Sequence, residues 1–174
     1  MPAKLLAPAA LAFAVAAAAQ TPPPPVPAGA KVNAQPYLDT AGQSDVFEIT
    51  SSQIALRKSA NPAVRRYATE MIRHHTMTTN DALAAAKAGG VLPPPPVLNA
   101  QYRAMISELN AAGAADFDRL YVGQQALSHR GALELTTGYA RTGDNPALRN
   151  AARRTVPIVK RHLDEVEAMR ARMM

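Results

Sequence analysis

Three of the four histidines in this 174-residue chain lie at the centre of otherwise apolar helical stripes. Residues three, four, seven and eleven apart share one face of an α-helix, so His75, His129 and His162 are each expected to point inward. Glu48 holds the equivalent place in a fourth segment. Neutral imidazole is the commonest metal ligand in proteins, and a carboxylate completes a shell of four ligands. The pattern therefore predicts a metal site made by Glu48, His75, His129 and His162.

These four side chains are also expected at one height of a helical bundle. At a rise of about 1.5 Å per residue, Glu48 lies roughly 18 Å and His75 roughly 22 Å from the turn that joins their helices. From the other turn, His129 lies roughly 21 Å and His162 roughly 28 Å along the chain's helices. Helices of about 27 residues are roughly 40 Å long, so every one of these groups falls near mid-height.

Further polar side chains on the same helix faces are expected to orient the ligands. Imidazole rings that bind metal are usually held by a hydrogen bond from their second nitrogen to a neighbouring polar group. The candidates for this outer role are Asp118, Tyr121, Gln125 and Glu165. His74 is rotated by about 100° from His75 on its helix, and we expect it at the edge of the bundle.

The donor set admits zinc, iron, manganese or copper as the bound ion. The pattern argues against a standard di-iron centre, which needs a Glu-x-x-His motif on two helices. Ile72 and Val159 stand at the positions that those glutamates would occupy. The competing interpretation is a buried network in which the polar groups satisfy one another and set the register of the helices.

The helices that carry these residues are defined by the turn and cap residues of the chain. Asn-Pro pairs at Asn61 and Asn145 are expected to begin helices, because Asn caps the N-terminus and Pro fits the first turn. Glycines at 89–90, 113 and 143 end or break them. The expected helices cover residues 37–59, 62–88, 99–111, 114–141, and 146 to near the C-terminus.

The order of these helices predicts an all-α fold. Two helical hairpins joined by a long crossover make a ferritin-like four-helix bundle, here with a short extra helix in the crossover. An Asn-Pro-Ala motif opens the second long helix of each pair, and a histidine follows some four turns later. Residues 37–174 are expected to form this bundle domain.

The first 36 residues predict export. Lys4 precedes an apolar run, and small residues follow it, so residues 1–19 read as a signal peptide. Residues 20–36 contain the prolines of a disordered linker. No later run reaches the roughly 20 apolar residues of a membrane span. We therefore expect a soluble periplasmic protein, with an uncleaved N-terminal anchor as the alternative.

The composition excludes several classes of function. The chain has no cysteine, so disulfides, thiolate nucleophiles and iron–sulfur clusters are excluded. The formal charge of +6 comes mainly from arginines, and there is no Trp and little other aromatic surface on which bases could stack. We expect no specific nucleic-acid binding, and only weak contact with an anionic envelope surface.

A set of motifs is spread along the predicted helices: Phe47-Glu48, Ala55-Leu56, Ser59 to Val64, Met71, His74 to Thr76, Phe117-Asp118, Tyr121, Gln125, His129, Val156-Pro157 and His162-Leu163. These motifs resemble a bacterial family catalogued as domain of unknown function 4142. The resemblance extends from about Tyr37 to Met169, and it implies an exported bundle of the ferritin-like superfamily. It implies no activity. Members of the family usually carry an acidic residue where this chain has His74.

The sequence leaves three functions open. The first is a binding or protective protein of the cell envelope, whose inward carboxylate and histidines hold one metal ion. The second is a metal-dependent redox enzyme that uses this ion. The third is a structural or interaction bundle with a buried polar network. An open coordination position would favour the enzyme, and a closed set of mutual hydrogen bonds would favour the structural protein.

Overall fold

The computed structural model describes residues 33–93 and 95–173, and these residues form helices without a strand. The helices are α1 (Ala34–Lys58), α2 (Pro62–Ala88), α3 (Ala100–Ala111), α4 (Ala114–Thr142) and α5 (Pro146–Ala171). The predicted all-α class is confirmed, and the observed bounds of α2 are those predicted. The predicted signal peptide at residues 1–19 and residues 20–32 of the predicted linker lie outside the described residues.

The first helix begins three residues earlier than the sequence predicts. Its first turn contains Gln35 and Pro36, which the sequence pattern assigns to the linker. Proline is tolerated there because the first backbone N–H groups of a helix have no partner within it. The side chain of Ala34 is already buried, so this first turn is part of the packed bundle.

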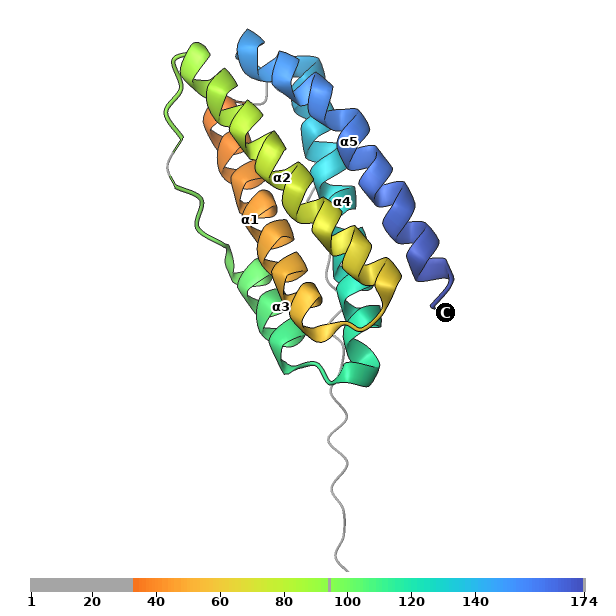
Figure 1. The fold of residues 1–174 in the computed structure, drawn as a ribbon. Coiled ribbons are helices and arrows are strands. Elements are labelled where there is room, and N and C mark those ends of the chain that lie inside the picture. The colour runs from red at the N-terminus through yellow and green to blue at the C-terminus, as the bar shows by residue number, and fades with distance from the viewer. Residues whose placement is uncertain (1–32, 94, 174) are drawn as a thin grey trace, which may run out of the picture.

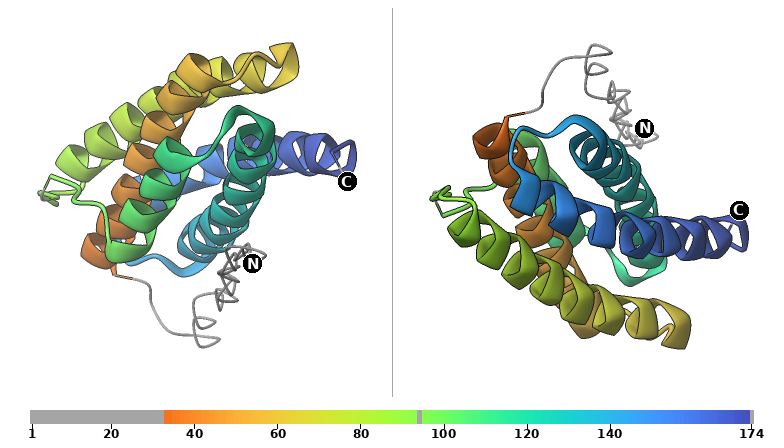
Figure 2. Two further views of the ribbon diagram at one scale, coloured as in Figure 1. Left: turned by 90° about the horizontal axis from the view of Figure 1, so that it is seen from below. Right: turned by 90° about the horizontal axis from the view of Figure 1, so that it is seen from above.

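The four long helices form a bundle with a full-length crossover (Figure 1). In that view α1 runs down and α2 runs up, and the chain then returns beside α1 to α3 at the bottom before α4 runs up and α5 runs down. Helix α1 packs on α2 and α4, and α5 packs on the same two helices, so neighbouring helices are antiparallel. Helix α3 covers α1 and α4 from outside, as the views along the bundle show (Figure 2). This is the predicted ferritin-like connectivity.

Apolar side chains fill the bundle on both sides of its middle. We call the larger group, near the α1–α2 turn, the lower cluster. It consists of Ile54, Ala55, Val64, Tyr67, Ala68, Met71, Leu109, Phe117, Tyr121, Val122, Ala126, Val166 and Met169. The upper cluster, near the α4–α5 turn, is smaller and includes Tyr37 and Tyr139, whose rings stack 3.9 Å apart. The buried residues Glu48, His75, His129 and His162 lie along their helices between these two clusters. We call these four residues, together with Gln125 beside His129, the polar layer.

Both Asn-Pro motifs cap helices as predicted. Asn61 and Asn145 each accept a hydrogen bond from the backbone N–H two residues further on, at 2.9 and 3.1 Å. Asn145 also donates to the carbonyl of Gly89 at 2.9 Å, and this bond ties the end of α2 to the start of α5. A Cβ on Gly89 would lie 2.3 Å from the Asn145 amide nitrogen, so the close approach depends on glycine.

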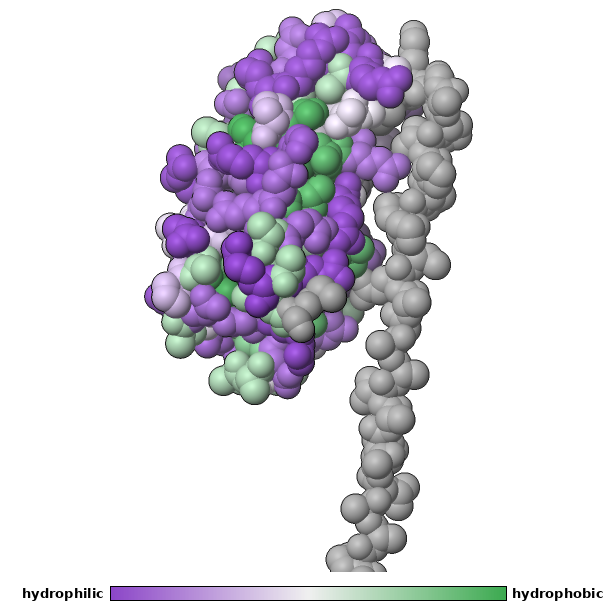
Figure 3. All heavy atoms as spheres, turned by 90° about the vertical axis from the view of Figure 1, so that its right-hand side faces the viewer, coloured by the Kyte–Doolittle hydropathy of each residue, from purple (hydrophilic) through white to green (hydrophobic). Residues whose placement is uncertain are grey.

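The surface of the bundle on the α5 side is mainly hydrophilic, with a narrow apolar strip (Figure 3). A shallow groove on α4 and α5 includes Leu133, Leu135 and Leu163, with Arg130 and Arg141 beside them. Within residues 33–93 and 95–173, every helix is too short or too polar to cross a membrane.

Candidate metal centre

The three predicted histidines meet in the middle of the bundle. His75 comes from α2, His129 from α4 and His162 from α5, and each pair of ring centroids is 5.4 Å apart. Their exposed fractions are 3%, 0% and 0%. One ligand nitrogen of each ring lies within 4.8 Å of those of the other two. We call this buried group the histidine triad.

The spacing of two triad nitrogens matches that of metal ligands. The Nε2 atoms of His75 and His129 are 3.4 Å apart. Two nitrogens that bind one ion at about 2.1 Å and at a tetrahedral angle lie roughly 3.4 Å from each other. The distance between these two nitrogens therefore fits a zinc-sized ion.

The second nitrogen of each of these rings is already engaged. His75 Nδ1 donates to Asp45 Oδ1 at 2.7 Å, and His129 Nδ1 donates to the backbone carbonyl of Gln125 at 2.9 Å. A carbonyl can only accept, so the proton of neutral His129 is on Nδ1 and its lone pair is on Nε2. The same holds for His75 beside the Asp45 carboxylate. Both lone pairs then face one point, which a cation or a shared proton would stabilise.

Asp45 is a site residue that the sequence pattern does not single out. Its Oδ1 accepts from His75, and its Oδ2 accepts from Thr79 Oγ1 at 2.6 Å, so the carboxylate is held from both sides. A carboxylate behind a metal-binding imidazole fixes the orientation of the ring and raises its basicity. The signal in the sequence is the spacing of Asp45 and Glu48, which are three residues apart on one face of α1.

The surroundings give the three rings different pKa values. Burial lowers the pKa of His75, but the hydrogen bond and charge of Asp45, together with the charge of Glu48, outweigh it and raise this pKa. Burial lowers the pKa of His129 despite the nearby Glu48 charge. Burial and the neighbouring histidines lower the pKa of His162 from 6.5 to about 2. His129 and His162 are thus neutral at neutral pH, which is the form that binds metal.

Glu48 points inward as predicted but lies beside the triad. Its Oε1 is 3.5 Å from His129 Nδ1, and Glu48 is not among the residues whose ligand atoms converge. Its exposed fraction is 1%, and neither carboxylate oxygen has a hydrogen-bond partner among the described residues. Such burial of an unpartnered carboxylate is costly. Direct coordination of a metal by Glu48 stays a prediction.

Two of the predicted outer residues, Gln125 and Tyr121, link α4 to α1. Gln125 Nε2 donates to Ser51 Oγ at 3.0 Å, and the Tyr121 hydroxyl lies 2.8 Å from Ser52 Oγ. Gln125 does hold His129, but through its backbone carbonyl and not through its side chain.

The other two predicted outer residues do not reach the triad. Asp118 is eleven residues before His129, or about 16 Å along α4, which is too far to orient its ring. Glu165 is partly exposed, and its charge acts on Tyr67. A shared helix face is not sufficient for contact, because the partner must also lie at the same height.

Comparison with known families and structures agrees with this fold. A family model described as "Domain of unknown function (DUF4142)" matches residues 18–169. The chain belongs to the DUF4142 family. A search of curated proteins gives no match. The crystal structure of a DUF305 fragment from Deinococcus radiodurans is similar with a TM-score of 0.70, at 17% identity over 86% of this chain and 99% of that one. At this identity the likeness shows the helical fold alone.

His74 of this DUF4142 domain is buried, whereas the sequence pattern places it at an edge. It is 4% exposed, its Nδ1 lies 2.7 Å from His162 Nε2, and the two rings stack with centroids 4.9 Å apart. The expected rotation away from His75 is present. However, α2 packs on α5 as well as on α1, so this second face of α2 is also covered. A single inward face per helix is therefore the wrong assumption for α2.

His74 belongs to a second group of ligand-type side chains. One ligand atom each of Glu70, His74 and His162 lies within 4.8 Å of the others. We call these three residues the outer group, because Glu70 is partly exposed. The DUF4142 domain thus has two such groups, and they share His162.

Proposed function

We propose that this DUF4142 domain is an exported protein that binds one transition-metal ion at the histidine triad. The observation that carries the proposal is the distance of 3.4 Å between the Nε2 atoms of His75 and His129, whose Nδ1 atoms are both engaged by other partners. His162 supplies the third nitrogen. In the proposed site, the negative charge of Glu48 beside His129 offsets the charge of the ion.

The donor set favours zinc or copper over manganese among the four ions that the sequence admits. Three imidazole nitrogens suit zinc, copper and iron, whereas manganese prefers oxygen ligands. A single buried carboxylate gives too few oxygens for manganese. We assign no reaction to the site.

The open hydrogen bonds of the polar layer argue against the alternative of a purely structural network. Within the described residues, both Glu48 oxygens, Gln125 Oε1 and His162 Nδ1 are buried without a hydrogen-bond partner. A network that serves only stability would be expected to satisfy these atoms, because each unsatisfied buried group costs about 1–3 kcal/mol. Metal binding would give the polar layer a function and a favourable interaction that offsets the free-energy cost of these unsatisfied atoms.

The test of metal binding uses untagged protein from Gln20 onward, stripped with a chelator and titrated with zinc, copper, iron and manganese in turn. We expect about one equivalent of one of these ions, and loss of binding in His75→Ala and His162→Ala. Thr78→Ala is the matched control, because Thr78 is buried on α2 but its hydroxyl donates only to the backbone carbonyl of His75. A wild-type protein that binds none of the four ions contradicts the proposal.

A change behind the site tests the geometry more finely. Asp45→Asn keeps the size of the side chain but removes the charge that orients His75, and we expect metal affinity to fall about 10- to 100-fold. Asp39→Asn on the same helix, where Asp39 accepts a hydrogen bond from Gln43, is the control and should leave the affinity unchanged. Equal affinities of the two variants would show that Asp45 does not orient a ligand.

Export is a separate part of the proposal, supported by the signal-like pattern of residues 1–19. Expression of the full chain in a Gram-negative host should yield a periplasmic protein whose N-terminus, read by mass spectrometry, lies near Gln20. An intact N-terminus on a cytoplasmic protein would contradict this part and leave the metal site untouched.

A further inference from the structure

The structure points to a route by which the ion reaches the buried triad. We propose that Glu70, His74 and His162 form an outer cation position, and that Arg161 covers it until an ion arrives. The inference rests on the proposed metal binding at the triad and names the side from which the ion comes. It assigns Glu70 and His74 a part in uptake and not in final coordination.

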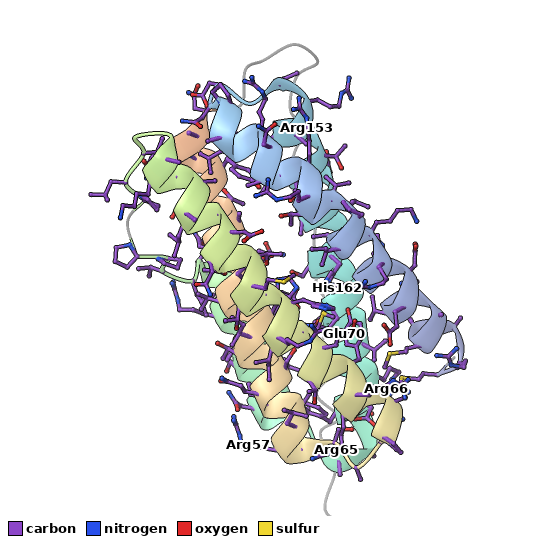
Figure 4. All side chains as sticks on the ribbon, turned by 45° about the horizontal axis from the view of Figure 1, so that its top comes forward. Arg57, Arg65, Arg66, Glu70, Arg153 and His162 are labelled. Carbon is purple, nitrogen blue, oxygen red and sulfur yellow. The ribbon has the colours of Figure 1, made fainter. Side chains whose placement is uncertain are left out.

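His162 connects the two groups. It contributes a ligand atom to the triad and to the outer group, so an ion can pass between them without losing contact with this ring. The triad is at most 3% exposed, whereas the side chain of Glu70 is 27% exposed. Glu70 on α2 and His162 on α5 lie close together where these two helices adjoin (Figure 4). The outer group therefore gives the triad a partly exposed carboxylate on the α2–α5 side.

The ring of His74 must change its tautomer to take this role. Arg73 donates to its Nε2 at 2.5 Å, so the proton of the neutral ring is on Nδ1, which donates to His162 Nε2. An ion therefore binds Nδ1 only after this proton has moved to Nε2 and Arg73 has released that atom. That Nδ1 is 3.5 Å from Glu70 Oε1 and 2.7 Å from His162 Nε2. The shorter of these distances is that of a hydrogen bond, so the two rings must separate by roughly 0.7 Å before an ion fits between them.

The nitrogen atoms are spaced differently in the two groups, and this explains why an ion would move from the outer group to the triad. Two nitrogens of the triad already have the spacing of metal ligands, whereas the rings of the outer group do not. The outer group also lies beside the positive charges of Arg73 and Arg161. An ion is consequently held less tightly there than in the triad.

The guanidinium of Arg161 lies against the outer group and occupies the side from which an ion would approach. Its Nη2 is 3.5 Å from Glu70 Oε1 and 3.3 and 3.4 Å from the two ring nitrogens of His74. A guanidinium therefore contacts two of the three side chains that would receive the ion. Its side chain is 57% exposed, and exposed pairs of this kind are weak, so it can move aside at small cost.

The test is the rate at which zinc binds to the stripped protein, followed by stopped-flow with a coloured zinc chelator. Arg161→Ala should speed association about twofold to fivefold, the factor equivalent to the loss of one exposed pair. Glu70→Gln should slow it by a similar factor. Both variants should still bind one zinc at equilibrium, because neither residue belongs to the triad.

Arg154→Ala is the matched control. Arg154 lies on the same helix, is 61% exposed and pairs with Asp81 at 3.9 Å, so its loss removes an equal charge about 10 Å further along α5. At 0.15 M salt, charges at this distance are largely screened. We expect the association rate of this variant to equal that of the wild type.

The outcomes separate the two proposals. If zinc binds but Arg161→Ala and Glu70→Gln both keep the wild-type rate, the outer position is wrong and the triad stands. If Arg154→Ala speeds binding as much as Arg161→Ala does, the rate depends on the net charge of α5, and the proposal that Arg161 specifically blocks the outer position is wrong. If the wild type binds no zinc, copper, iron or manganese, the metal function and this route both fall.

Discussion

The lower cluster and the histidine triad adjoin each other but hold the bundle in different ways. Tyr67 of the lower cluster lies edge-on to His129, with ring centroids 6.4 Å apart, and its hydroxyl donates to the backbone carbonyl of His162. The cluster is mainly apolar, and its members are at most 2% exposed. The triad and Glu48 are equally buried, yet oxygen and nitrogen atoms there have no partner among the described residues. The cluster stabilises the fold, whereas the unpartnered polar atoms of the polar layer lower its free energy of unfolding.

The largest change in stability is expected when an aromatic ring is removed from the lower cluster. Phe117 is fully buried, stacks on Tyr121 with centroids 6.2 Å apart, and lies 5.5 Å below the Lys58 ammonium. We expect Phe117→Ala to lower the free energy of unfolding by about 3–5 kcal/mol, measured by urea denaturation of the stripped protein. Leu92→Ala, at a side chain that is 92% exposed, should change almost nothing.

The metal affinity of the folded Phe117→Ala protein should equal that of the wild type. Loss of metal binding in this variant while its helices remain folded would show that the lower cluster also supports the metal site.

A change in the polar layer should have the opposite sign. Glu48→Leu removes a buried carboxylate that has no hydrogen-bond partner among the described residues, so we expect the stripped protein to gain about 1–3 kcal/mol in its free energy of unfolding. The same variant should bind metal more weakly because the site loses the negative charge beside His129. Glu134→Leu, an exposed change on α4, is the control. A less stable Glu48→Leu protein would show that the carboxylate has a stabilising partner.

A smaller effect is expected at the end of the bundle, away from both regions. Asn145→Ala removes a helix cap and also the hydrogen bond to Gly89, so it should cost about 1–2 kcal/mol of unfolding free energy. Asn61→Ala removes the cap alone and should cost less. Thermal unfolding of both variants checks the order. The reverse order would mean that the α2–α5 tie carries no stability.

The smallest effect concerns pH. Histidine in the unfolded chain takes up a proton as the pH falls through about 6.5, whereas His162, with its pKa lowered to about 2, does not in the fold. Stability of the stripped protein is therefore lost as the pH falls, by about 0.7 kcal/mol between pH 7 and pH 6 for this one group. His129 acts in the same direction, and His75, whose pKa is raised, acts in the opposite one. Denaturation of wild type and His162→Leu at both pH values measures the contribution of His162 to the free energy of unfolding. Equal pH dependence of the two proteins would contradict it.

The helices could be predicted from local chemistry, and the contacts between them only in part. Asn caps, prolines and glycines act within one turn, which is why the bounds of α2 come out as predicted. The inward direction of the three histidines follows from helical periodicity in the same way. The contacts of His74 and Asp45 depend on how α2 sits between α1 and α5. The spacing of Asp45 and Glu48 shows that they share a face of α1, but it does not show which ring Asp45 meets on α2. Asp118 shows the converse, because it shares a face with His129 but not a height.

The crossover connection means that the proposed ion would link two separate helical hairpins. It places the ligands on two hairpins whose own helices contact each other directly, whereas the triad forms only when the hairpins dock. A bound ion would then act as a removable cross-link between two cooperative units. Stripped protein should open along the hairpin interface and exchange its amide hydrogens there. Loaded protein should exchange them only by global unfolding, so the same chain would offer a protease a cleavable state or a resistant one according to the metal content of its surroundings.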